Sequence, residues 1–357
     1  MAFLSLDSLQ QKKRTHVVAI DLGARKTKAL ALQRRGQGFD LANYVILDAP
    51  SPEKPLSPEI LAPHLKAVMQ ELGAKTKQVV LSIGVNDSLL RQVELPAMPR
   101  SEMRQVLRYG SKNYLQQDLS DHVFDCHILP PRAAVPGGPD QPRAALKCKA
   151  LVGGAKKSHI EMLQASCKEA GLSAEQVAVG MTGPANAFEK AVPESFEKEV
   201  VALVDIGFKS STIAILLHGE LALNRVVGLG GDRLTLGLAE TMGVSYDDAE
   251  KMKIELPDEA QLAMSALLIP LGRELRASID FFEHQQEKNV AQIYLSGGSA
   301  QSRFLVESIQ SELIVPCKTW NPVSFLGVTL PPQKVSLLEQ DAPQLAVAAG
   351  AAVAAAF

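Results

Sequence analysis

The sequence predicts an α/β fold of two similar lobes, because the chain carries one local pattern twice and a glycine turn after it. Residues 16–32 and 202–217 read HVVAIDLGARKTKALAL and ALVDIGFKSSTIAILL. In each stretch an apolar run, Asp-x-Gly, short polar residues and a second apolar run predict a tight β-hairpin. Residues 293–305, IYLSGGSAQSRFL, predict a strand that passes through two glycines into a helix.

The chemistry of these three stretches fits a cleft that binds phosphate groups. Glycines let backbone N–H groups approach phosphate oxygens closely. Asp21 and Asp205, near the ends of the first strands, would hold a hydrated Mg²⁺ ion rather than touch phosphate. One Asp-x-Gly hairpin alone is usually only a turn. Two near-copies followed by Ser-Gly-Gly predict two lobes that close on one nucleoside triphosphate.

The composition argues against several other classes of protein. A formal net charge of −2 predicts no general attraction to nucleic acid or anionic membranes. The four cysteines lie far apart and the histidines lack metal-ligand spacing, so we expect neither a disulfide frame nor a zinc site. The start of the chain has no secretory signal pattern. The apolar run at 345–357 is shorter than the ~20 residues that cross a bilayer and predicts a buried helix.

The elements after the first hairpin complete one lobe. Residues 41–47 predict a third strand, and the Pro-rich stretch 49–58 predicts a surface loop. An amphipathic helix is expected at 58–72, ending at Gly73, before a short buried strand at 79–83. This βββαβ order is the unit repeated in the actin and Hsp70 superfamily.

An inserted subdomain and then the second lobe follow. In the insert we expect a helix at 101–115 capped by Ser101, strands at 123–129 and 145–152 around a Pro- and Gly-rich loop at 130–142, and a helix at 157–170. A helix at 177–191 leads to the second hairpin. Beyond it we expect a strand at 220–227, a turn at 228–231, helices at 234–242, 245–252 and 260–288 with a break at Pro270, a strand at 293–296, and Ser299 as a helix cap.

Four stretches of the chain resemble the PilM family, the cytoplasmic actin-like components of type IV pilus assembly, which are similar to the cell-division protein FtsA. They are AIDLGARKTK, DIGFKSSTIAIL, GLGGDRLTLGLAETMGVSYDDAEKMK and IYLSGGSAQSRFL, and the third is the most diagnostic. The resemblance runs from about residue 16 to the C-terminus. It implies a two-lobed actin/Hsp70-like ATPase superfold, α/β in class, with an inserted FtsA-type 1C subdomain.

The resemblance also implies domain limits. They are 15–94 with 173–198 for lobe 1 (1A), 95–172 for subdomain 1C, 199–227 with 290–357 for lobe 2 (2A), and 228–289 for subdomain 2B. The return of the last helix to lobe 1 stays open.

The family's site, carried onto this chain, implies ATP with Mg²⁺ held through water by Asp21 and Asp205. The first hairpin would contribute Asp21, Gly23, Ala24, Arg25, Lys26, Thr27 and Lys28, and the second Asp205, Gly207, Phe208, Lys209, Ser210 and Ser211. The remaining site residues would be Gly230, Gly231, Glu250, Lys253, Gly297, Gly298 and Ser299.

Some of these residues have an alternative interpretation. Without the family, Glu250 and Lys253 would predict an exposed helix salt bridge rather than a ribose and adenine contact. Arg25, Lys26 and Phe208 stand where the family has small residues, so they would either strengthen phosphate binding or fill its space. The helix start GMTGPANAFEK offers no convincing base, since Asn186 is a poor one, and predicts weak or no ATPase activity.

The resemblance implies a cytoplasmic scaffold, peripheral at the inner membrane through partners. Its main partner would be a PilN-like bitopic inner-membrane protein, whose N-terminal peptide lies in the groove between lobe 1 and the insert. Other pilus platform components and a homo-oligomer are further possible partners; nucleic acid is not. The alternatives are a small-molecule kinase of the sugar or acetate type and an FtsA-like membrane filament. The filament is disfavoured because the sequence ends AAVAAAF without a cation.

Four cations recur every four residues on the helix expected in the insert: Arg100, Arg104, Arg108 and Lys112. A solvated face is the simpler interpretation. The sharper hypothesis is a face turned toward anionic lipid or acidic residues of the partner.

Overall fold

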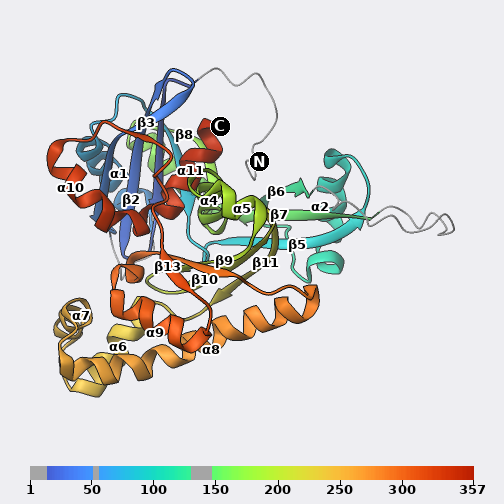
Figure 1. Ribbon diagram of the computed structural model, residues 1–357. Helices are drawn as coiled ribbons and strands as arrows, with labels where there is room; N and C mark the ends of the chain where they lie inside the picture. The colour runs from blue at the N-terminus through green and yellow to red at the C-terminus, as the bar shows by residue number, and fades with distance from the viewer. Residues whose placement is uncertain (1–13, 51–55, 130–146) are drawn as a thin grey trace.

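Two sheets with the same strand order form the centres of two lobes in the computed structural model, which describes residues 14–50, 56–129 and 147–357 (Figure 1). The first sheet has the order β14-β3-β2-β1-β4-β8 and the second β11-β10-β9-β12-β13. In both, three antiparallel strands are followed by parallel ones. The repeated hairpin of the sequence is therefore part of a repeated lobe, and the predicted actin-like fold class is confirmed.

The first lobe is built from elements at both ends of the chain. Its strands are β1 (His16–Leu22), β2 (Lys26–Arg35), β3 (Gly38–Asp48), β4 (Gln78–Ile83), β8 (Ser173–Val179) and β14 (Gly327–Val328). Its helices are α1 (Pro58–Leu72), α3 (Lys157–Glu169), α4 (Gly183–Ala191), α5 (Pro193–Lys198), α10 (Pro332–Asp341) and α11 (Ala346–Ala356). Helix α1 ends where predicted, because Gly73 adopts the left-handed conformation that closes the helix.

The second lobe and its helical subdomain are continuous in sequence. The strands are β9 (Val200–Ile206), β10 (Ser211–Leu217), β11 (Glu220–Val227), β12 (Gln292–Ser296) and β13 (Cys317–Thr319). The helices are α6 (Gly231–Met242), α7 (Tyr246–Glu255), α8 (Asp258–Gln286) and α9 (Arg303–Leu313). In Figure 1 helices α6 to α9 lie together below the second sheet.

The insert is a three-stranded antiparallel sheet, β5 (Ser88–Pro96), β7 (Lys147–Lys156) and β6 (His122–Ile128), packed against α2 (Arg100–Leu115). The first strand of this sheet, β5, begins at Ser88, and the sequence analysis missed this strand. Helix α3 packs against α1, and its Leu163 and Cys167 are buried in the first lobe. The domain limits stay a prediction, and the loop expected at 130–142 lies outside the described residues, as do residues 51–55 of the loop expected at 49–58.

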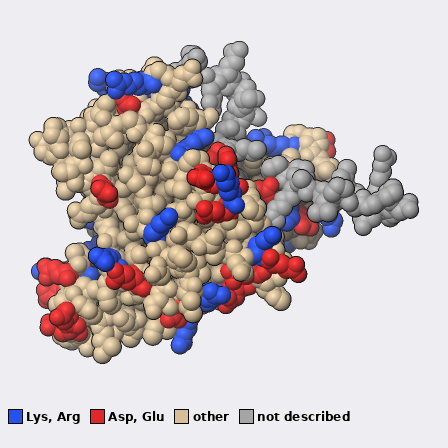
Figure 2. Space-filling model, in the orientation of Figure 1, with Lys and Arg blue, Asp and Glu red and all other residues tan. Residues whose placement is uncertain are grey.

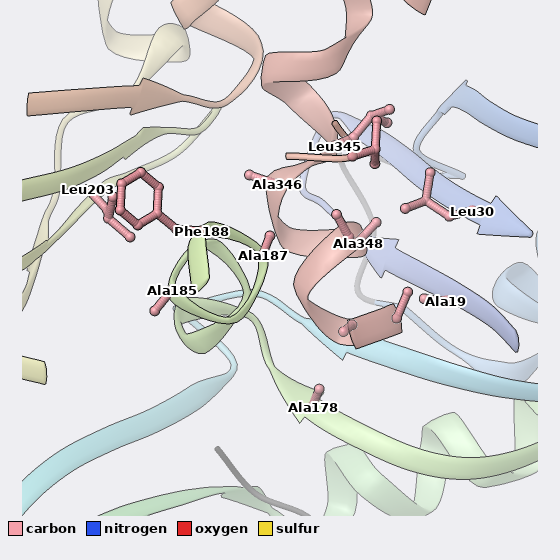
Figure 3. Packing of buried hydrophobic residues seen from close by; sticks show 14 of the residues in the cluster. Ala19, Leu30, Ala178, Ala185, Ala187, Phe188, Leu203, Leu345, Ala346 and Ala348 are labelled. Atoms are coloured by element: carbon pink, nitrogen blue, oxygen red, sulfur yellow. The ribbon is translucent and has the colours of Figure 1, made fainter. Parts of the chain in front are cut away.

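The last helix packs unusually closely inside the first lobe. Helix α11 contacts α4 and β1, and its alanines belong to one apolar cluster with Ala19 and Leu30 (Figure 3). A Cβ atom at Gly350 of α11 would overlap the backbone carbonyl of Gly183 in α4. The helix predicted for the alanine-rich end is confirmed, and its small residues let two helix backbones touch.

Two local predictions about helices were wrong for identifiable reasons. The stretch 177–191 is not one helix, because Val177 and Val179 continue the parallel pairing of β8 with β4 and α4 starts only at Gly183. Pro270 does not break α8, since it lies on the exposed side between the buried Leu268 and Leu271. The lost backbone hydrogen bond therefore faces water.

Two predicted caps were also misplaced. Helix α2 begins at Arg100 after Pro99, so Ser101 lies inside it. Ser299 lies in a 3₁₀ turn, and Ser302 caps α9 instead by accepting a hydrogen bond from the Leu305 N–H at 3.3 Å. Both corrections move a helix start by a few residues without changing the order of elements.

The cations of α2 are largely balanced within the insert. Arg100 Nη2 and Arg104 Nε lie 2.5 and 2.8 Å from the two carboxylate oxygens of Asp125. Lys112 Nζ lies 2.9 Å from Asp118 Oδ2. The hypothesis of a face turned toward anionic lipid or an acidic partner stays a prediction, and Arg100 and Arg104 would have to exchange Asp125 for such a surface. Figure 2 shows Lys and Arg scattered among Asp and Glu on the face in view, with acidic side chains gathered at the lower left.

Candidate functional site

Strand pairing fixes the position of the aspartate in each hairpin. Asp21 in β1 is the partner of Lys28 in β2. Asp205 in β9 is the partner of Ser296 in β12, the last residue before the turn at Gly297. Asp205 also lies close enough to Lys28 and Asp21 for their charges to affect its pKa, so the ends of β1 and β9 meet where the two lobes face each other.

A buried cluster of two carboxylates and one cation lies at the ends of these strands. Lys28 Nζ donates to Asp21 Oδ2 at 3.1 Å, and Ser296 Oγ donates to Asp205 Oδ1 at 3.4 Å. Burial raises the pKa of Asp205 to about 6; Lys28 opposes this rise and the negative charge of Asp21 adds to it. The cluster has two carboxylates but only one cation, so one more positive charge is needed before both carboxylates can be ionised and paired.

At two glycines of the candidate site a side chain would collide with neighbouring backbone. Gly297 has φ +95°, and a Cβ atom there would overlap the Ile206 carbonyl; one at Gly230 would overlap the Phe208 carbonyl. Gly207 donates its N–H to Ser210 O at 3.1 Å, and Gly231 donates to Gly207 O at 2.9 Å. These bonds fix the second hairpin against α6. A Cβ at Gly298 would meet only Gln344 Oε1 at 3.8 Å, so this turn has room above it.

Glu250 and Lys253 form a half-buried network with α6, not an exposed salt bridge. Lys253 Nζ donates to Glu250 Oε2 and Thr235 Oγ1, both at 2.7 Å, and to Gly231 O at 3.2 Å. Burial lowers the pKa of Lys253. Burial acts to raise the pKa of Glu250, but hydrogen bonds from Lys253 and Thr235 outweigh it and lower this pKa. The alternative interpretation of this pair as a solvated helix contact is therefore wrong.

Arg25 reaches from the first hairpin to the second lobe. Its guanidinium lies 3.6 Å from Glu250 Oε1, 3.5 Å from Tyr246 Oη and 5.1 Å from the centre of the Phe208 ring. Lys209 Nζ approaches the same ring at 5.0 Å and pairs with Asp232 at 2.8 Å. Two of the three residues that depart from the family pattern, Arg25 and Phe208, thus contact one another between the lobes.

Several predicted site residues have side chains engaged elsewhere. Lys26 pairs with Asp48 at 2.6 Å, and Thr27 hydrogen-bonds His64 at 2.8 Å. Ser211 donates to Leu229 O at 2.6 Å. Ala24 lies exposed in the first turn, and Ser210 contributes its carbonyl to the second. These residues contribute to the site through the backbone of the two hairpins.

Ser299 lies beside Gly231, where a Cβ atom would be 2.8 Å from its hydroxyl oxygen. The glycine turn and the start of α6 therefore meet at one wall of the cleft, as the predicted residue set requires. The roles of the set in binding stay a prediction.

Two residues of the candidate site, Tyr246 and Ser296, were missed in the sequence. Tyr246 donates to Asp232 Oδ1 at 2.8 Å, and burial with this bond raises the pKa of Tyr246 to about 12. Ser296 was seen only as the end of a strand. Tyr246 follows a good N-cap, Ser245, but nothing in its spacing indicates that it faces the cleft.

A small apolar hollow lies where the insert meets both lobes. Strands β5 and β7, the start of α4 and strands β10 and β11 surround it, with the lining residues Leu90, Leu151, Met181, Thr182, Ala185, Ala214, Leu221 and Asn224. Asn224 Nδ2 donates to Leu90 O at 3.3 Å beside it. The hollow is large enough for part of one apolar side chain, not for a nucleotide.

Among residues 14–50, 56–129 and 147–357, no group of three or more His, Cys, Asp and Glu side chains has the arrangement of a metal site. Within the same part of the chain, every helix is too short or too polar to cross a membrane.

Comparisons with known proteins agree on one family and one fold. A family model described as type IV pilus assembly protein PilM matches residues 19–356. The solved "PilM-PilN type IV pilus biogenesis complex" superposes with a TM-score of 0.83 at 22% identity, covering 97% of this chain and 99% of that one. MreB5 of Spiroplasma citri, titled as bound to ADP, superposes with a TM-score of 0.53 at 10% identity, covering 95% of each chain.

One curated protein also matches a short part of the sequence. FtsA of Bacillus subtilis is 41% identical over 56 residues, which are 16% of this chain and 13% of that protein. The match thus spans only a small part of this relative. The similarity to the MreB5 structure shows the actin-like fold alone.

Proposed function

The chain belongs to the PilM family of type IV pilus assembly proteins, and from that premise we propose that it is a nucleotide-binding scaffold of a type IV pilus or related secretion machine. A family match over nearly the whole chain favours this role over a small-molecule kinase. The scaffold would act in the cytoplasm, held at the inner membrane by a PilN-like protein. Other platform components and a second copy of the chain are further partners of this role.

The convergence of two hairpins and a glycine turn on Asp21, Lys28 and Asp205 carries the nucleotide proposal. The residues fit ATP with Mg²⁺: the carboxylates would hold water molecules of the ion, and Lys28 would face phosphate. The space above Gly298 and the Glu250–Lys253 pair would receive the nucleoside. The bound ion would supply positive charge that offsets the phosphates.

We propose that hydrolysis is weak or absent. The helix that faces the cleft, α4, begins Gly-Pro-Ala-Asn, and Asn186 is 2% exposed and carries an amide rather than a base. Glu189 lies 3.5 Å from Lys190 on the same helix. A water molecule would therefore meet no carboxylate of this helix start, which is the part that orients water in hydrolysing enzymes.

Titration calorimetry of nucleotide-stripped protein tests this proposal. We expect ATP or ADP to bind with Mg²⁺, and Asp205→Ala to weaken binding by roughly tenfold, because a charged hydrogen-bond acceptor is lost. Asp48→Ala is the control, since Asp48 is an exposed carboxylate that pairs with Lys26 on the outer side of the hairpin. If millimolar nucleotide produces no heat of binding, the site is one that no longer binds nucleotide.

The proposed partner peptide comes from a PilN-like protein, since the complex with the similar fold is titled as one with PilN. The apolar hollow lies where the insert meets both lobes, and it would receive part of one apolar side chain of an extended peptide. Deleting the insert from 95 to 172 is a poor test because it removes α3, whose Leu163 is buried in the first lobe.

Filling the hollow is a sharper test. Ala185→Leu should weaken binding of the PilN-like N-terminal peptide by about tenfold or more, because the anchor loses burial worth roughly 1.5–3 kcal/mol. The matched control is Ala266→Leu, at an exposed position of α8. Fluorescence anisotropy with labelled peptide measures both variants. Unchanged affinity in Ala185→Leu, with ATP binding intact, would place the peptide elsewhere.

A further inference from the structure

The tips of the two phosphate-binding hairpins touch through Arg25 and Phe208. Arg25 belongs to the turn between β1 and β2, and Phe208 to the turn between β9 and β10. The guanidinium lies over the ring at 5.1 Å, within the range of a cation–π contact. It also lies 3.6 Å from Glu250 and 3.5 Å from Tyr246, both in α7. One side chain of lobe 1 thus contacts two separate elements of lobe 2.

These contacts belong to a network of three cations and two carboxylates where the two lobes meet. Lys209 lies over the same ring and pairs with Asp232, which also accepts a hydrogen bond from Tyr246. On the opposite side, the second oxygen of Glu250 is held by Thr235 and Lys253. Arg25 is the member of this network that comes from the first lobe, and its neighbour Lys26 points instead to Asp48.

The Arg25 contacts are exposed and of kinds that are individually weak. Its side chain is 38% exposed, and its ion pair with Glu250 is longer than the 2.7–2.9 Å of a close charge-assisted hydrogen bond. Exposed ion pairs and cation–π contacts are each weak. Together these contacts favour the closed arrangement of the lobes but are weak enough to break.

We propose that Arg25, Phe208 and Glu250 form a clasp that holds the cleft closed in the ligand-free protein and must open before a nucleotide enters. The clasp lies at the phosphate end, between the two hairpin tips. Once Arg25 has released Glu250, a polyphosphate can take the position between the tips. The closing contact concerns the ligand-free chain; its effect on nucleotide entry rests on the proposed function.

Solution X-ray scattering of the ligand-free full chain tests the closing contact. Arg25→Ala should increase the radius of gyration, and Arg25→Glu should increase it further because the new carboxylate repels Glu250. Arg35→Ala is the matched control, since Arg35 pairs with Asp40 inside lobe 1 at 3.2 Å. Thermal melting checks that all variants fold. Identical scattering of wild type and both Arg25 variants, or an equal change in Arg35→Ala, would overturn the clasp.

Stopped-flow binding of a fluorescent ATP analogue tests the effect on entry. We expect the association rate constant to rise about tenfold in Arg25→Ala and to stay at the wild-type value in Arg35→Ala. Weaker ATP binding with unchanged scattering would make Arg25 a phosphate ligand and overturn the clasp. If Arg25→Ala opens the cleft while no variant binds nucleotide, the clasp stands and the nucleotide proposal fails.

Discussion

Replacing Gly350 with alanine should destabilise the protein by more than about 3 kcal/mol, a large share of the ~5–15 kcal/mol that holds a typical domain folded. The new methyl group would overlap the carbonyl of Gly183, and the atoms it meets are backbone rather than a side chain that can turn away. Helices α11 and α4 would have to separate, which opens the apolar cluster around Phe188. Urea denaturation and thermal melting measure the loss.

Gly110→Ala is the matched control for this prediction. Gly110 also lies inside a helix, α2, but its Cβ would meet only Tyr114 Cε2 at 3.4 Å, an ordinary contact. Alanine is the better helix former, so this variant should gain roughly 0.5–1 kcal/mol. Equal stability of the Gly350 and Gly110 variants would show that α11 and α4 do not touch as described.

Asp205→Asn should stabilise the ligand-free protein at pH 7.5 by about 3 kcal/mol. Burial raises the pKa of Asp205 to about 6 from its ordinary value of 3.8, and each unit corresponds to about 1.4 kcal/mol. Because the folded pKa is the higher one, the folded state binds the proton more tightly. The stability from this carboxyl is present below pH 4 and is lost as the pH rises toward 6 and beyond.

The difference between Asp205→Asn and wild type should therefore shrink to near zero at pH 4. Urea midpoints at pH 4, 5, 6 and 7.5 measure this difference. Asp48→Asn is the opposite case, since the hydrogen bond from Lys26 lowers the pKa of Asp48 and its loss cannot stabilise the protein at neutral pH. A pH-independent difference for Asp205→Asn would argue against a buried, readily protonated carboxyl.

The parts that could be predicted from the sequence are those fixed by local pattern. The two hairpins, the end of α1 at Gly73 and the strand β11 follow from alternation, turn residues and helix signals within a few positions. The proximity of Asp21 and Lys28 follows from hairpin pairing. Duplication then placed Asp205 in the same cleft, although no local signal links the two lobes.

The parts that could not be predicted depend on contacts between distant elements. Burial of Glu250 comes from α6 packing on α7, so an i, i+3 pair that looks solvated is half-buried. Arg25 gained its partners from the other lobe, more than 180 residues away in sequence. The wrong helix at 177–191 arose because a buried parallel strand and a buried helix share the same apolar composition.

The close packing of α11 on α4 and β1 has a consequence for how the protein is made. The first strand of the chain is covered by a helix at residues 346–356, so the first lobe lacks part of its core until that helix leaves the ribosome. Residues 200–313, which hold most of the second sheet and its helices, emerge earlier. At ~5–20 residues per second, the N-terminal lobe waits many seconds in an incomplete state. The lobe synthesised first is therefore expected to be finished last, with its apolar face open to chaperones meanwhile.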